Sequence, residues 1–166
     1  MLELKKIHRE AVSADLAKVE RYRLLTQPRL AESICRDILA VDENNQEAKR
    51  QLILVITDQF VKNKGALEKR AREIVETLES EYDRSYYAGI IAERLGKAAV
   101  DSHTPGSNHD AYEWFHDAMA FYERAEVLET DGNDDAILRW NTCARQIENN
   151  KLTKRPPEER FQPMLE

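Results

Sequence analysis

Hydrophobic residues recur along this chain at spacings of three and four, the period of an α-helix with one buried face. These series group into pairs over residues 13–42, 45–80 and 83–130, and a last series covers residues 133–149. No segment shows the strict alternation that is typical of a half-buried strand. We therefore predict an all-α fold of about seven helices, arranged as antiparallel neighbours.

Turn-forming and capping residues predict where these helices begin and end. Pro28 suits the first turn of the second helix, and Ser13 is the expected cap of the first. The run 42–45, Asp-Glu-Asn-Asn, forms a turn and offers a cap for the third helix. Gly65 is expected to end that helix, and Ser107, with an Asp three residues later, resembles a capping box.

Composition and charge limit the function classes. The 166 residues suit one domain, which we assign to residues 1–150, followed by a charged, Pro-containing tail, 151–166, that we expect to be extended or disordered. A net charge of −6 argues against nucleic acid as a partner. No apolar run approaches the roughly 20 residues that cross a membrane, and no signal peptide is evident, so we expect a cytoplasmic protein.

The two cysteines, Cys35 and Cys143, each lie on an apolar helical stripe and far apart in the sequence. This placement predicts buried free thiols and no disulfide framework.

Two segments share one plan, in which a small residue precedes a large residue by four positions and an apolar one by seven. The positions are Ala31, Cys35 and Ile38 in one segment and Ala118, Tyr122 and Ala125 in the other. Tyr22 stands nine residues before the first of them. With these spacings the chain resembles the tetratricopeptide repeat family.

The resemblance implies helix pairs that stack as a short right-handed superhelix. It further implies a concave groove, lined by the first helix of each pair, that holds a peptide or protein. Because 87 residues separate the two matching alanines, we expect the unit at residues 83–130 to be enlarged and its loop lengthened.

One candidate binding cluster lies in the last helix, where Ile137, Trp140, Ala144 and Ile147 form the predicted buried stripe. Three polar residues mostly miss this stripe, namely Arg139, Asn141 and Arg145. Guanidinium groups match the geometry of carboxylates, so this cluster is a candidate site for an acidic peptide. The alternative is an ordinary solvated helix face.

A second candidate is Arg84 with Tyr86 and Tyr87, which together would form an aromatic and basic wall of the groove. Adjacent residues lie about 100° apart on a helix, so we expect one tyrosine to pack and the other to be partly exposed.

Metal binding is the runner-up function. His109, Glu113 and His116 share one helical face at a spacing that suits a metal ion, but the favoured alternative is ordinary polar residues on the solvated side of that helix. The sequence holds no Gly-rich phosphate loop and no nucleophile elbow, so we expect neither an enzyme nor a cofactor.

The leading interpretation is thus a non-catalytic adaptor or scaffold that binds a protein or peptide partner. Self-association as a homodimer through the last helix is an open alternative. The apolar-tipped stretch at residues 160–165 is a further candidate, as a segment that occupies the groove of its own or a neighbouring molecule.

Overall fold

The computed structural model describes residues 2–60 and 64–157 of the chain. Within these two ranges all regular structure is helical, so the predicted all-α fold is confirmed. A short 3-10 turn, η1 (Arg9–Ala11), precedes seven helices, which are α1 (Val12–Leu24), α2 (Pro28–Val41), α3 (Gln46–Thr57), α4 (Lys64–Val75), α5 (Glu81–Ser102), α6 (Ser107–Leu128) and α7 (Asp135–Asn149).

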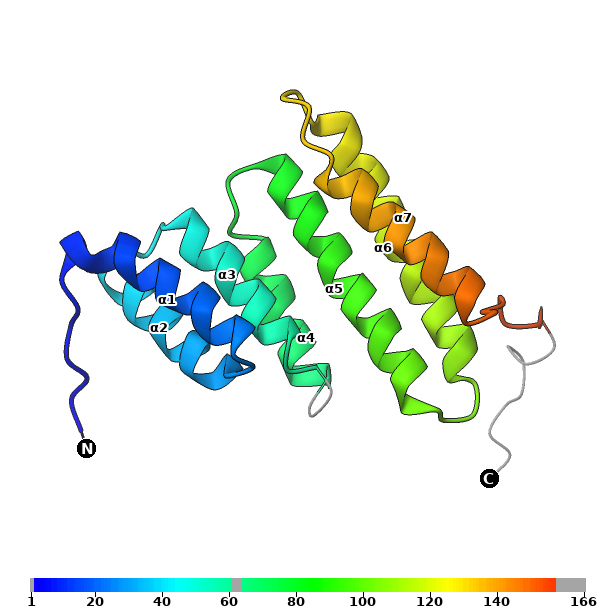
Figure 1. Cartoon of the computed structure of the whole chain (residues 1–166), viewed down its shortest axis with the longest axis horizontal. Helices are drawn as coiled ribbons and strands as arrows, with labels where there is room; N and C mark the ends of the chain where they lie inside the picture. The colour runs from blue at the N-terminus through cyan, green and yellow to red at the C-terminus, as the bar shows by residue number, and fades with distance from the viewer. Residues whose placement is uncertain (1, 61–63, 158–166) are drawn as a thin grey trace.

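The helices are arranged in the order of the chain, from α1 and α2 at one end of the molecule to α6 and α7 at the other (Figure 1). Each helix packs against the next along the chain, and in addition α1 contacts α3 and α3 contacts α5. The first helices of the three pairs therefore lie next to one another. In the described part of the chain no helix combines the length and the hydropathy that a membrane span requires.

The hydrophobic core consists of two clusters that meet at α5. One cluster is built by α1 to α4 together with two residues of α5, Ile91 and Leu95. The other is built by α5, which contributes Ile90, with α6 and α7. Trp114 and Tyr87 pack against both clusters. Because α5 is buried on two sides, it connects the two halves of the molecule.

The pair α5–α6 is the enlarged unit, with 22 residues in each helix against 12 to 14 in α1 to α4. The expected lengthened loop is wrong, since only residues 103–106 connect the two helices. Two glycines let them approach closely. A Cβ atom on Gly89 would lie 2.6 Å from the ring of Tyr122, and one on Gly96 would lie 3.1 Å from the ring of Phe115.

Two of the predicted helix starts are confirmed. Pro28 is the first residue of α2, where its missing N–H costs no hydrogen bond. Asn45 caps α3, because its Oδ1 accepts a hydrogen bond of 2.8 Å from the backbone N–H of Ala48.

Three other predicted boundaries are wrong. Ser13 lies inside α1, which begins one residue earlier. Gly65 lies in the first turn of α4, since α3 has already ended at Thr57. Ser107 is buried as the first residue of α6 and makes no cap hydrogen bond; Gly106, with φ of 80°, supplies the turn instead.

The described part of the segment after α7 contacts the rest of the molecule through residues 152, 153 and 155. Leu152 is buried in the core cluster of α5 to α7. The carbonyl of Thr153 lies 2.8 Å from Nδ1 of His109, and Arg155 forms an ion pair with Asp110. Residues 160–165, the candidate groove ligand, lie outside the described residues.

Both cysteines are buried and unpaired with each other, as predicted. Burial raises the pKa of each thiol to about 12, and a nearby carboxylate, Glu32 for Cys35 and Glu93 for Cys143, acts in the same direction. These thiols are therefore neutral parts of the core at physiological pH.

Candidate binding site

A buried polar network joins α5, α6 and α7. Glu93 of α5, only 8% exposed, accepts a hydrogen bond of 2.6 Å from the hydroxyl of Tyr122 on α6. Its other carboxylate oxygen accepts a bond of 3.0 Å from the Arg139 guanidinium on α7. A buried carboxylate is tolerated only where donors and a cation satisfy it, and here one residue of each neighbouring helix does so.

The electrostatics of the network keep Tyr122 neutral and Arg139 charged. Burial raises the pKa of Tyr122, and the Glu93 carboxylate raises it further. Burial alone would lower the pKa of Arg139, but the Glu93 carboxylate together with Tyr86 and Tyr122 outweighs this effect, and the pKa is raised. The Arg139 side chain remains 34% exposed while its Nη1 donates to Glu93.

Three tyrosines of α5 continue this network toward the surface. Tyr82 and Tyr86 stack with ring centroids 5.8 Å apart, and Tyr86 meets Tyr87 edge to face at 5.2 Å. All three are half-buried. Tyr86 also packs against Tyr122 at 5.8 Å. We call Tyr82, Tyr86, Tyr87 and Arg139 the tyrosine–arginine strip.

The tyrosine hydroxyls are neutral over the physiological range. Burial raises the pKa of Tyr82 to about 12, with a smaller effect of Tyr86 and Asp135 in the same direction. Burial likewise raises the pKa of Tyr86, which an interaction with Arg139 partly opposes. Neutral phenols of this kind both donate and accept hydrogen bonds while their rings offer apolar area.

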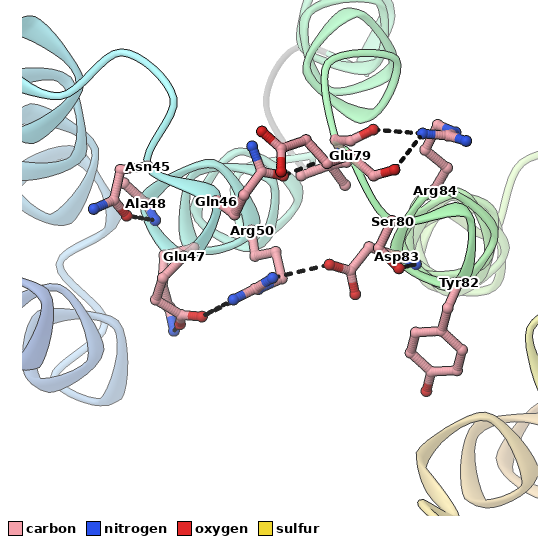
Figure 2. A network of polar contacts seen from close by, with 12 residues as sticks. Asn45, Gln46, Glu47, Ala48, Arg50, Glu79, Ser80, Tyr82, Asp83 and Arg84 are labelled. Atoms are coloured by element: carbon pink, nitrogen blue, oxygen red, sulfur yellow. Dashed lines mark hydrogen bonds and ion pairs between the residues drawn. The ribbon is translucent and has the colours of Figure 1, made fainter. Parts of the chain in front are cut away.

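An ion pair ties the α5 end of the strip to α3. Arg50 donates to Asp83 over 2.9 Å and to Glu47 over 2.7 Å, so it connects α3 with the first turn of α5 (Figure 2). Ser80 caps α5 by accepting a hydrogen bond from the backbone N–H of Asp83. The start of α5, and with it the position of Tyr82, is thereby fixed.

The structure does not bring Arg84 together with Tyr86 and Tyr87 as one wall. Figure 2 looks along α5 and shows Arg84 and Tyr82 on opposite sides of that helix. Arg84 donates to the carbonyls of Leu78 at 2.6 Å and Glu79 at 3.0 Å, which secures the connection between α4 and α5. Tyr86 and Tyr87 are both half-buried and both pack against the core.

The predicted cluster on α7 is divided in the same way. The helix buries Ala136 and Cys143, whereas Ile137 is 38% exposed. The buried face is therefore rotated by about one residue from the predicted stripe, and Arg139 lies on it. Asn141 is half-buried and Arg145 is exposed, so the three polar residues do not form one cluster.

The histidine face of α6 does not form a metal centre in the described part of the chain, where no group of three or more His, Cys, Asp and Glu side chains is placed to hold a metal ion. His109 faces the carbonyl of Thr153, and the ring of His116 lies against Tyr112 with centroids 4.3 Å apart.

Comparison with known proteins adds no assignment: no protein-family model, curated protein or solved structure matches this chain. The interpretation of the site therefore rests on its own geometry.

Sequence reasoning missed Glu93, Tyr82 and Tyr122 as members of the site. A signal for Glu93 was present in the sequence, because this carboxylate lies among Ile90, Ile91 and Leu95 in a helix that is apolar on two sides. Such a residue requires a buried cation or donor as its partner. The identity of that partner depends on how the helices cross, which the sequence does not reveal.

Proposed function

We propose that this protein is a non-catalytic, cytoplasmic adaptor that binds a segment of a partner protein on the face formed by its first helices. The proposal includes a divergent tetratricopeptide-like superhelix built of the pairs α1–α2, α3–α4 and α5–α6, with α7 as the closing helix. It is supported by the serial contacts of α1 with α3 and of α3 with α5. Helices in such an order offer one continuous surface to an extended ligand.

The observation that carries the proposal is the tyrosine–arginine strip. Tyr and Arg are the residue types most enriched among the hot spots of binding surfaces. Here the rings pack against one another and Arg139 is held by Glu93, so little side-chain freedom is lost when a ligand binds. The strip thus combines apolar ring area, neutral hydroxyls and one partly exposed cation.

Tyr82 is the sharpest position at which to test this function. Its hydroxyl contacts only Asn133, over 3.2 Å, among the hydrogen-bonding groups of the described residues. Replacement by Ala therefore removes ligand contacts and leaves the buried network intact. A matched control is Tyr112→Ala, which removes another half-buried tyrosine whose ring lies on α6 against His116.

The experiment captures partners from the host lysate with the wild-type protein, identifies them by mass spectrometry and measures the affinity of each purified candidate by calorimetry. We expect Tyr82→Ala to weaken binding about tenfold, the loss typical of a hot-spot tyrosine, and Tyr112→Ala to leave it unchanged. Equal affinities of wild type and Tyr82→Ala for every captured partner would refute the proposed site.

A further inference from the structure

A second surface lies on the other side of α5, between α4 and α6. A cavity of about 330 Å³ opens there, and its floor includes the apolar side chains of Ala88, Ile91 and Phe121. Ile91 is fully buried, while Phe121 is half-buried. Because Arg84 lines this cavity and Tyr82 lies on the opposite side of α5, the cavity is separate from the tyrosine–arginine strip (Figure 2).

Three arginines surround this apolar floor, one from each of the helices α4, α5 and α6. Arg84 donates to two backbone carbonyls, and Arg124 lies 4.7 Å from the centroid of the Phe121 ring. In the described part of the chain neither of these two guanidinium groups pairs with a carboxylate. Arg72 does, through Glu68 at 2.9 Å. Arg84 and Arg124 thus contact uncharged groups and form no direct ion pair with the described residues, in a chain whose net charge is −6.

Two glutamates, Glu76 and Glu81, also line the cavity, and both are exposed. The lining thus carries three positive and two negative side chains. The arginines attract an anionic ligand and the glutamates repel it. The charge of the ligand can therefore be tested by removing a side chain of either sign.

We propose that this cavity docks a segment of a partner protein that presents carboxylates next to one large apolar side chain. The apolar side chain lies on Phe121 and Ala88, and the carboxylates bind Arg84 and Arg124 through their remaining N–H donors. The contact of Arg124 with the Phe121 ring uses none of its N–H groups as a hydrogen-bond donor to an acid, so Arg124 binds an acid without leaving Phe121. A volume of about 330 Å³ suits one or two side chains of such a segment.

This surface extends the proposed function, because the strip and the cavity lie on opposite sides of α5 and can bind two segments at once. The inference does not depend on the strip: the cavity, its arginines and Phe121 make no use of Tyr82 or Arg139. The two proposals therefore fail or succeed separately.

The test uses the full chain and a fluorescein-labelled peptide, Gly-Glu-Glu-Phe-Glu-Gly, with binding followed by fluorescence anisotropy. Two control peptides replace the three Glu by Lys, or the Phe by Ala. We expect the acidic, Phe-containing peptide to bind and both controls to bind at least fivefold more weakly. We also expect its affinity to fall as salt is added.

Variants of the protein then locate the peptide. Arg124→Gln should weaken binding about fivefold, because it removes a hot-spot type of contact. Glu76→Gln should strengthen it, because it removes a like charge. Arg145→Gln, an exposed arginine on α7, is the matched control and should change nothing. Circular dichroism confirms that each variant is folded.

Three results would overturn the inference. The first is equal or tighter binding of the Lys peptide. The second is a loss in Arg145→Gln as large as the loss in Arg124→Gln, which indicates general charge attraction. The third is a loss in Tyr82→Ala with none in Arg124→Gln, which assigns the peptide to the tyrosine–arginine strip and thus supports the proposed function alone.

Discussion

The ring of Tyr122 crosses α5 at Gly89, where the missing side chain leaves room for the phenol to bring its hydroxyl to Glu93. Glu93 in turn holds Arg139, whose outer part belongs to the tyrosine–arginine strip. The absence of a side chain at position 89 thus leaves the space that the Tyr122 ring occupies. At the residue scale, the candidate site depends on a glycine that contacts no ligand.

Replacement of Gly89 by Ala tests this dependence. Its Cβ would lie 2.6 Å from the Tyr122 ring, so we expect a net loss of about 1–3 kcal/mol in the free energy of unfolding, the usual effect of overpacking. Gly65→Ala is the matched control, since no atom lies within 4 Å of its new Cβ and the helix propensity of Ala adds a few tenths to about 1 kcal/mol of stability. Urea unfolding followed by circular dichroism measures both. Equal stabilities of the two variants would contradict the proposed close packing.

At the scale of elements, α7 is attached to the rest of the molecule by few large side chains. Its buried residues are Ala136 and Cys143, and Trp140 is half-buried with its indole N–H bonded to Glu123 over 3.0 Å. Small residues let a helix approach closely but bury little apolar area. The helix packs mainly on α6, and the ion pair of Arg139 with Glu93 adds a contact with α5.

A double-mutant cycle on Glu93 and Arg139 measures this contribution. Arg139→Gln leaves a buried carboxylate without its cation, and we expect a loss of about 2 kcal/mol, below the value for a fully buried pair because Arg139 is partly exposed. The double variant with Glu93→Gln should lose less than the sum of the two single variants, by about 1 kcal/mol or more. Arg145→Gln serves as a control with no expected effect. Strict additivity in urea unfolding would show that the pair does not couple α5 to α7.

At the scale of the whole molecule, both core clusters contain weak acids that are neutral at physiological pH. Cys35 lies in the cluster of α1 to α4, and Cys143 lies in the cluster of α5 to α7. Burial raises both thiol pKa values from 9.0 to about 12 in the folded chain. The unfolded chain therefore releases these protons at a lower pH than the folded chain does.

This difference predicts an alkaline loss of stability. A raised pKa in the folded state contributes stability that is fully present below the unfolded pKa and is lost as pH rises through the folded pKa. We expect the thiol contribution to be constant up to about pH 9 and to fall between pH 9 and 12. Urea unfolding at several pH values should give a smaller decline for the variant Cys35→Ala with Cys143→Ala than for the wild type. An identical pH dependence would exclude the thiols as its cause.

Parts of the candidate site could be predicted because Tyr86, Tyr87 and Arg139 carry their binding chemistry in their side chains. Their arrangement could not. Arg84 follows Asp83 directly in the sequence, yet it faces the α4–α6 side of α5, and Arg139 turned inward although its spacing from the large apolar residues suggested the opposite. The predicted buried face of the last helix was chosen mainly from its large apolar residues. The residues that α7 buries are the smaller Ala136 and Cys143, so the face was predicted wrongly.

The sequence by itself determined the helices, because their apolar period, Pro28 and the Asn45 cap act within a few residues of each other. It also determined that the two thiols are buried, since each lies on a local apolar stripe. Only the tertiary structure decided which face of α7 is buried, that Glu93 meets Tyr122 and Arg139, and that α5 presents tyrosines on one side and an arginine-lined cavity on the other. Those outcomes depend on contacts between residues 29 and 46 positions apart, whose geometry is set by how whole helices pack.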